Sequence, residues 1–281
     1  MPLRHPIVAV LGHVDHGKTT LLDRIRGTSV AAREPGAITQ WIGASMLPAE
    51  TLERRCGELL KQLKFKIVVP GILFVDTPGH ETFSNLRRRG GSAADIAVLV
   101  VDVLKGVEPQ TVESINILKA RRTPFVVAAN KIDMIKGWRS VEGRTFAEAL
   151  AKQAPEIQTN LDEYVYRILG SLSRLGFNSE RFDRVRDFRT NVAIVPTSAK
   201  TGEGVSELLS TLVGLTQTFM KEDLTTTAGP AKGTVLEVKE EPGLGVTVNA
   251  IIYDGILKVG ERIVLGGRQD VIETYVRAIL L

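Results

Sequence analysis

Cysteine, long apolar runs and internal repeats are scarce or missing in this sequence. The single cysteine, Cys56, cannot form an internal disulfide or a cysteine metal cluster, which suits a reducing compartment. No apolar run approaches the roughly 20 residues that a membrane helix needs, and residues 1–6 contain no apolar signal segment. We therefore expect a soluble, cytoplasmic protein that does not bind a membrane.

Hydrophobic residues are plentiful: they make up 43% of the 281 residues, enough for one large core, or one large and one small. This composition excludes a disordered chain. The net charge of +4 permits an acidic partner such as RNA but does not demonstrate one. Function has to be inferred from motifs, because the charge alone does not decide it.

Short β-branched runs alternate with helical stretches between residues 7 and 221, the pattern of a mostly parallel sheet covered by helices on both faces. Near-continuous apolar runs, typical of strands buried on both faces, occupy residues 7–11, 72–75, 96–101, 125–129 and 192–195. Helices are predicted at 19–26, 81–89, 110–120 and 203–220. The charged stretch 136–189 is longer than a βαβ connection requires, so we expect helical elaboration on the rim of the sheet.

The composition changes after residue 221. Residues 223–231 form a polar linker rich in Thr, Gly and Pro, and beyond it the apolar period becomes two, with Gly-rich turns. We expect an α/β domain over residues 1–222 and the beginning of a β-barrel over 232–281. About 50 residues are few for a closed barrel, so we expect this second domain to be truncated.

The strongest motif is the loop at residues 12–19, which reads Gly-His-Val-Asp-His-Gly-Lys-Thr between a predicted strand and a predicted helix. Its glycines allow the backbone to wrap a phosphate, so that successive N–H groups face the negative charge. Lys18 supplies a positive charge to the β and γ phosphates, and the Thr19 hydroxyl is placed to ligate Mg²⁺. The residues expected to bind nucleotide here are Asp15, His16, Gly17, Lys18, Thr19 and Thr20.

A second motif, Asp-Thr-Pro-Gly-His at residues 76–80, follows another predicted strand. In this position the Asp76 carboxylate can hold Mg²⁺ through water, and the Gly79 N–H can reach the γ-phosphate. Alone, an Asp-x-x-Gly sequence is as consistent with an ordinary turn. Its place after a strand, downstream of a phosphate loop, favours the functional interpretation.

A third motif indicates which base is bound. Asn-Lys-Ile-Asp at residues 130–133 follows a strand, so its side chains emerge at the carboxyl edge of the sheet, where ligands bind in such folds. Asp133 can accept hydrogen bonds from guanine N1–H and N2–H₂, which adenine does not offer. Asn130 is expected to tie this loop to the phosphate loop, and the stem of Lys131 to cover one face of the base. Backbone N–H groups facing guanine O6 are expected from Ser198, Ala199 and Lys200.

The sequence resembles the translational GTPases, on the strength of the two motifs at residues 12–20 and 76–80. More narrowly, residues 36–44 resemble the first switch of the initiation factor 5B family, called initiation factor 2 in bacteria. Ala37 and Trp41 depart from the family pattern, where glycine and histidine are usual. Downstream segments, including residues 176–185, resemble the archaeal and eukaryotic branch, and the resemblance covers nearly the whole chain.

The resemblance implies a P-loop GTPase fold and a set of roles. Thr39 would ligate Mg²⁺ and sense the γ-phosphate, His80 would orient the attacking water, and Lys18 would neutralise developing charge. Asp15 resembles a family position that can bind a monovalent cation, K⁺ or Na⁺. The implied ligands are GTP, GDP and Mg²⁺. The implied partners of a monomeric factor are both ribosomal subunits, together with initiator tRNA through domains that this chain lacks.

Several alternatives remain at this stage. An elongation factor that carries aminoacyl-tRNA would share the motifs, although the match at residues 137–185 argues against it. A nucleotide-gated binding module would bind GTP without hydrolysing it. Asp133 opposes a P-loop ATPase or a small-molecule kinase. Arg33 remains a candidate arginine finger, and residues 87–89, Arg-Arg-Arg, fit either a contact with ribosomal RNA or protein or a solvated helix face.

Overall fold

The computed structural model of this protein describes residues 3–27, 43–62, 65–76, 94–267 and 270–280. The chain divides into two compact units, His5–Leu224 and the remainder of the chain. The division falls between Leu224 and Thr225, inside the stretch where the sequence predicts a linker. Among the helices that the structure describes, none combines the length and apolar character that crossing a membrane requires.

The larger unit is built on a seven-stranded sheet in the order β2-β3-β1-β4-β5-β7-β6. All neighbouring pairs are parallel except β2 and β3, which are antiparallel. The strands are β1 (Ile7–Gly12), β2 (Gly43–Pro48), β3 (Gly71–Asp76), β4 (Ile96–Asp102), β5 (Phe125–Asn130), β6 (Ser179–Arg181) and β7 (Val192–Pro196). The predicted α/β fold with a mostly parallel sheet is confirmed.

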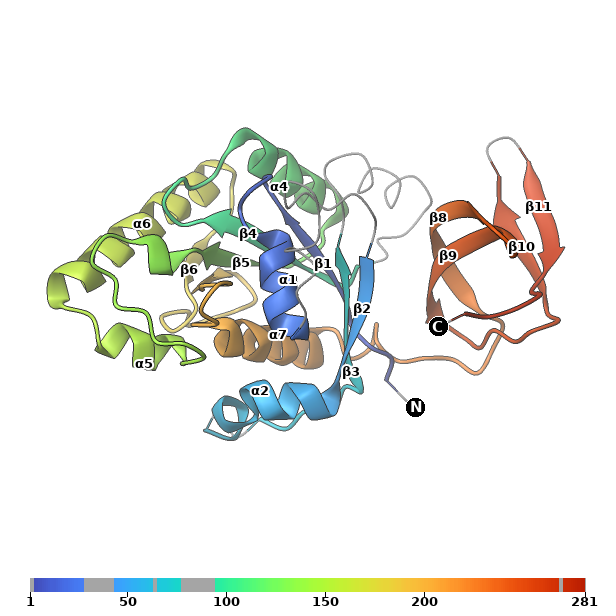
Figure 1. The fold of residues 1–281 in the computed structure, drawn as a ribbon, viewed down its shortest axis with the longest axis horizontal. Helices are drawn as coiled ribbons and strands as arrows, with labels where there is room; N and C mark the ends of the chain where they lie inside the picture. The colour runs from blue at the N-terminus through green and yellow to red at the C-terminus, as the bar shows by residue number, and fades with distance from the viewer. Residues whose placement is uncertain (1–2, 28–42, 63–64, 77–93, 268–269, 281) are drawn as a thin grey trace. The chain divides into compact units, whose positions relative to one another are not determined.

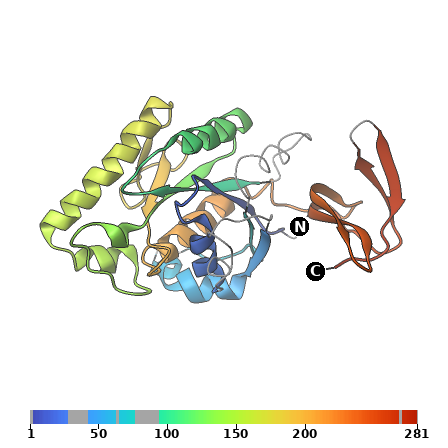
Figure 2. The ribbon, with the colours of Figure 1, turned by 45° about the horizontal axis from the view of Figure 1, so that its top comes forward.

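Helices cover both faces of this sheet. Figure 2 shows α4 and α6 on one side, and α1, α2 and α7 on the other. Alternate strand residues such as Ala9, Leu99 and Val127 belong to one buried cluster with apolar residues of α4 and α6. The helices are α1 (Lys18–Arg26), α2 (Ala49–Gln62), α4 (Pro109–Arg121), α5 (Phe146–Ala151), α6 (Pro155–Arg174), α7 (Val205–Phe219) and the short 3₁₀ helix η2 (Ile132–Met134).

Central strands are buried on both faces, as their sequences predict. Every residue of β4 is buried, as is every residue of β5. A fully buried parallel strand offers no polar face, so its sequence is a continuous apolar run. This layer positions the loops that follow β1, β3, β5 and β7 at one edge of the sheet.

Two edge strands were absent from the predicted elements. Strand β2 alternates between exposed and covered residues, and β6 consists of Ser-Glu-Arg, so neither carries a continuous apolar run. The stretch 136–189 contains the predicted helical elaboration, α5 and α6, and also β6, which extends the sheet beyond β7. The predicted helix at 81–89 lies outside the described residues.

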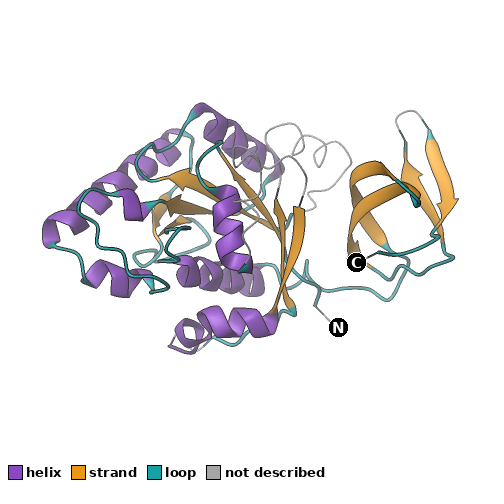
Figure 3. Cartoon of the chain, viewed as in Figure 1, coloured by secondary structure: helices purple, strands orange, loops and turns teal. Residues whose placement is uncertain are grey.

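The smaller unit contains strands but no helix among its described residues (Figures 1 and 3). Strands β8 (Lys232–Glu241) and β9 (Gly245–Asp254) form one antiparallel pair, and β10 (Arg262–Gly266) and β11 (Val271–Tyr275) form another. The described residues of this unit form two separate two-stranded sheets and no closed barrel.

Candidate nucleotide-binding site

The predicted motifs lie at the carboxyl ends of neighbouring strands. The loop at residues 12–19 follows β1, Asp76 ends β3, Asn130 ends β5, and Ser198 lies just after β7. Because these strands are parallel and lie within one sheet, their carboxyl ends share one edge. The fold therefore places segments that are far apart in sequence around a common site.

Glycine is required at two positions of the phosphate loop. Gly12 has φ +143°, and a Cβ added there would lie 2.2 Å from the Val100 carbonyl oxygen. Gly17, with φ +89°, comes directly before α1, and a Cβ there would lie 2.6 Å from Asn130 Nδ2. Asp15 also has a positive φ, +64°. The loop conformation therefore depends on residues without side chains at the points of closest approach.

Lys18 folds over its own loop. Its Nζ donates to the Gly12 carbonyl at 3.0 Å and to the His13 carbonyl at 2.8 Å. Burial lowers the pKa of Lys18, while the nearby charges of Asp76 and Asp15 act in the opposite direction. A partly desolvated ammonium group beside the N-terminus of a helix is well suited to bind phosphate oxygens.

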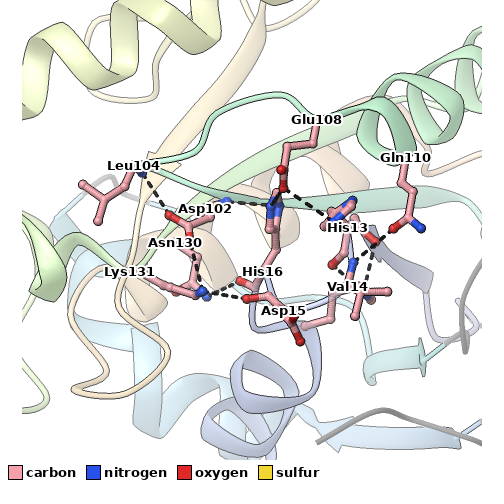
Figure 4. A network of polar contacts seen from close by, with 12 residues as sticks. His13, Val14, Asp15, His16, Asp102, Leu104, Glu108, Gln110, Asn130 and Lys131 are labelled. Carbon is pink, nitrogen blue, oxygen red and sulfur yellow. Dashed lines mark hydrogen bonds and ion pairs between the residues drawn. The ribbon is translucent and has the colours of Figure 1, made fainter. Parts of the chain in front are cut away.

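His16 is fully buried and links the phosphate loop to the β4–α4 connection (Figure 4). Its Nδ1 accepts a hydrogen bond from Asp102 N–H at 3.2 Å, so the ring proton lies on Nε2, which donates to Glu108 Oε2 at 2.6 Å. Burial lowers the pKa of His16, and this effect outweighs the opposing influence of Glu108. The contact is therefore a hydrogen bond from a neutral imidazole to a carboxylate. A second tie joins Val14 N–H to Gln110 Oε1 at 3.2 Å.

Asn130 joins the phosphate loop to the loop after β7. Its Nδ2 donates to the His16 carbonyl at 2.9 Å, and its Oδ1 accepts from Ala199 N–H at 2.9 Å. Asn130 is only 1% exposed, and these two hydrogen bonds give both of its polar side-chain atoms a partner within the protein. The tie to the phosphate loop is the contact that the sequence predicts for this residue.

Lys131 reaches back to the phosphate loop. It has φ +70°, and its Nζ donates to the Asp15 carbonyl at 2.6 Å and forms an ion pair with Asp102 Oδ2 at 2.8 Å. Its stem therefore spans the distance between two loops of the site. The sequence predicts that this stem covers a face of the base, and its observed course permits that role.

Asp133 is held by a hydroxyl from the neighbouring loop. Ser198 Oγ donates to Asp133 Oδ1 at 2.6 Å and accepts from Thr201 N–H at 3.1 Å. Ser198 is fully buried, so its hydroxyl has a fixed orientation. This contact fixes one carboxylate oxygen of the residue predicted to read guanine.

The loop at residues 198–200 differs in detail from its predicted use. The Ser198 N–H donates to the Glu203 carbonyl at 2.9 Å, and the Ala199 N–H donates to Asn130. Two of the three N–H groups predicted to face guanine O6 therefore already have partners in the protein. Arg24 of α1 donates to the carbonyls of Ala199 and Lys200, which ties this loop to the phosphate-loop helix.

Two residues with oxygen ligands suited to Mg²⁺, Thr19 and Asp76, lie close to the phosphate loop. Thr19 is in the first turn of α1 and is 7% exposed, and Asp76, at the end of β3, is 2% exposed. Asp76 pairs in register with Val10, just before the phosphate loop, and its charge acts on Lys18. A hydroxyl and a carboxylate are hard oxygen donors of the kind Mg²⁺ prefers.

Thr39, Gly79 and His80 lie outside the described residues, as do Ala37, Trp41, Arg33 and residues 87–89. Three of the predicted site residues that the structure describes are exposed: Asp15, Thr20 and Lys200. The described part of the site therefore contains the phosphate and base loops together with Asp76.

Three acidic residues in the site were missed by sequence analysis: Asp102, Glu108 and Glu203. Glu203 is fully buried and accepts from Val141 N–H at 2.9 Å and Thr201 Oγ1 at 2.7 Å. Asp102 does have a signal in the sequence: it is the only charged residue of β4 and stands at the end of an otherwise apolar strand. Nothing in the local sequence marks Glu108 or Glu203.

Comparison with protein families agrees with this geometry. Residues 3–218 match the family described as the elongation factor Tu GTP binding domain. A probable translation initiation factor IF-2 of Staphylothermus marinus is 62% identical over 281 residues, covering 99% of this chain and 46% of that protein. The corresponding protein of Sulfurisphaera tokodaii is 59% identical, again over 99% of this chain and 46% of its own length. The chain thus spans less than half of these relatives.

Solved structures show the same similarity. The GDP-bound aIF5B of Aeropyrum pernix superposes with a TM-score of 0.89 at 57% identity, over 98% of this chain and 46% of that one. The elongation factor SelB of Methanococcus maripaludis, in complex with GppNHp, has a TM-score of 0.56 at 24% identity, which shows a shared fold alone. The resemblance to initiation factor 5B found in the sequence is confirmed.

Proposed function

We propose that this chain, which belongs to the family of the elongation factor Tu GTP-binding domain, binds GTP and GDP and hydrolyses GTP within a translation initiation factor. In this proposal residues 1–222 form the GTP-binding domain, 223–231 a linker, and 232–281 the start of a β-barrel. The GDP named for the Aeropyrum pernix structure supports the choice of ligand.

The observation that carries the proposal is the placement of Asn130. One side chain bonds both the phosphate loop, through the His16 carbonyl, and the loop that carries Ala199. Phosphate binding and base binding are therefore organised as one site. A glycine turn or a solvated strand-end loop would not require this buried bridge.

Guanine selectivity is assigned to Asp133. Its carboxylate, oriented by Ser198 Oγ at 2.6 Å, accepts hydrogen bonds from guanine N1–H and N2–H₂. Adenine offers neither of these donors, so it would desolvate the carboxylate without replacing the hydrogen bonds to water that are lost, which is a large penalty. Lys131 covers a face of the base, and Lys200 supplies a backbone N–H to guanine O6.

Hydrolysis is proposed as in-line attack of water on the γ-phosphorus, catalysed by positioning and charge neutralisation. Lys18 leaves the carbonyls of its own loop to bind the β and γ phosphates. Thr19, Asp76 through water, and Thr39 would hold Mg²⁺, which supplies further charge neutralisation when bound. By family resemblance, Gly79 contacts the γ-phosphate and His80 orients the water.

The biological setting is proposed from the relatives, which are initiation factors. The ribosome would stimulate hydrolysis after subunit joining and so license release of the factor. Contacts with initiator tRNA would belong to parts of the factor beyond this chain. We place the monomeric factor in the cytoplasm, with Asp15 as a site for K⁺ or Na⁺ near the phosphates.

Phosphate release, measured with and without both ribosomal subunits, tests the proposal. We expect slow turnover by the chain alone and faster turnover with ribosomes. His80→Ala should keep nucleotide affinity within several-fold of wild type and lose most of the stimulated hydrolysis. A wild-type chain that binds GTP but shows no turnover under either condition would instead be a nucleotide-gated binding module.

A further inference from the structure

The acidic residue at the end of β4 contacts both nucleotide loops. We infer that Asp102 is a positioning residue that slows guanine-nucleotide dissociation by holding Lys131 against the phosphate loop. The inference rests on the proposed binding of GTP and GDP and assigns to one side chain the control of how long they stay bound.

The carboxylate of Asp102 is buried and fully engaged. The residue is 3% exposed, its Oδ2 pairs with Lys131 Nζ at 2.8 Å, and its Oδ1 accepts from Leu104 N–H at 3.0 Å. Burial raises the pKa of this carboxyl, but the hydrogen bonds from Lys131 and Leu104 outweigh it and bring the pKa below its ordinary value. Asp102 is therefore ionised at neutral pH.

Lys131 transmits this hold to the phosphate loop. The same Nζ that pairs with Asp102 donates to the Asp15 carbonyl at 2.6 Å (Figure 4). An ammonium group with two acceptors has less rotational freedom than one with a single acceptor. Asp102 thus stabilises the Lys131 side-chain conformation in which the stem extends from the base-reading loop to the phosphate loop.

The backbone of Asp102 acts separately from its side chain. Its N–H donates to His16 Nδ1 at 3.2 Å, and this bond orients a buried ring of the phosphate loop. Replacing the side chain leaves this N–H in place. Asp102→Asn, which keeps size and shape, therefore removes the charge paired with Lys131 while retaining the hydrogen bond to His16.

Release of a bound purine requires the stem of Lys131 to move off the base. With Asp102 ionised, that movement breaks an ion pair shielded from solvent on one side, which raises the barrier to dissociation. Association does not require this ion pair to break, so its rate should change little. Loss of a hydrogen bond to a charged group of this kind corresponds to about a tenfold change in rate.

Dissociation of a fluorescent GDP analogue from the full chain, chased with unlabelled GDP in a stopped-flow instrument, measures this effect. Asp102→Asn should dissociate about tenfold faster, with the association rate within about twofold of wild type. Asp95→Asn is the matched control, because Asp95 precedes the same strand and its Oδ2 accepts from Ile7 N–H at 2.7 Å. The control should keep the wild-type dissociation rate even where its unfolding temperature falls.

A double-mutant cycle separates positioning from a general structural effect. Lys131→Met keeps the stem and removes the ammonium, so it should speed dissociation by itself, and adding Asp102→Asn should then change little. Additive effects, or a wild-type dissociation rate in either single variant, would overturn the inference while leaving the proposed function intact. A wild-type chain that fails to bind the GDP analogue would overturn the proposed function and this inference together.

Discussion

The phosphate loop and the base-reading loops are organised in different ways. In the phosphate loop, shape comes from the backbone, with positive φ at Gly12, Asp15 and Gly17 within one short segment. The base-reading loops are held by side-chain hydrogen bonds between segments that are distant in sequence. An example is the bond from Ser198 Oγ to Asp133, which joins residues 65 positions apart.

This difference indicates how each region should respond to substitution. Phosphate oxygens are common to all nucleotides, so a change in the phosphate loop should weaken every nucleotide alike. The base is read by one carboxylate, so a change there should alter the preference among bases. The ratio of affinities for GTP and for the xanthine nucleotide XTP is therefore the measurement that separates the two regions.

The largest expected effect is on that ratio. Asp133→Asn should lower GTP affinity by about 100-fold or more, because two hydrogen bonds to a charged group are lost. It should improve XTP binding, since the new amide can donate to the 2-oxo group. Titration calorimetry with both nucleotides measures the change. Asp187→Asn, which removes a carboxylate that caps its own turn through Arg189 N–H, serves as the control. If Asp133→Asn retained the wild-type preference for GTP, the assignment of guanine reading to this residue would be wrong.

In the phosphate loop, Gly17→Ala should weaken GTP, GDP and XTP by a similar factor of about 30. A left-handed backbone costs a non-glycine residue about 1 kcal/mol, and displacement of Asn130 costs about 1 kcal/mol more in a lost hydrogen bond. Gly243→Ala is the matched control, because Gly243 has φ +82° with open space around its Cβ position. The affinities for all three nucleotides measure the effect. A change in the ratio of the GTP and XTP affinities would show that the phosphate loop also influences base preference.

Ser198→Ala tests how far base reading depends on the residue behind Asp133. The variant removes the bond to Asp133 Oδ1 and the acceptor for Thr201 N–H, so we expect GTP affinity to fall about tenfold and the GTP preference to narrow. Ser210→Ala is the control. It also removes a buried hydroxyl, which donates to the Ser206 carbonyl at 2.7 Å, and it should leave nucleotide binding unchanged. Equal losses for GTP and XTP would show that Ser198 acts on the whole site.

The two regions also differ in how much the sequence reveals. The phosphate loop is a local motif whose glycines are required by its own backbone, so residues 12–19 predict the structure directly. The bond from Ser198 Oγ to Asp133 joins segments that only the folded sheet brings together, so sequence analysis assigned Ser198 by its backbone and missed its hydroxyl.

The same reasoning applies to the fold. Buried strands such as β4 were predictable because burial on both faces requires continuous apolar residues. Strands β2 and β6 lie at the edges of the sheet and were missed. An edge strand forms because its backbone pairs with the neighbouring strand, and this pairing leaves no continuous apolar pattern in its side chains. Asp102 and Glu108 flank the β4–α4 connection, yet their partners, Lys131 and His16, come from other parts of the chain.

The smallest expected effect comes from Glu108, which bonds the phosphate loop from outside it. Glu108→Gln keeps an oxygen that can accept from His16 Nε2–H and removes only the charge of a half-buried side chain, so affinities should stay within about threefold of wild type. Because Glu108 acts on the phosphate loop, any loss should be equal for GTP and XTP, as calorimetry can measure. Arg144→Gln, a neutralised surface charge paired with Glu148, controls for net charge. A change of base preference in Glu108→Gln would mean that His16 couples the phosphate loop to base reading, and the two regions could no longer be treated as separable.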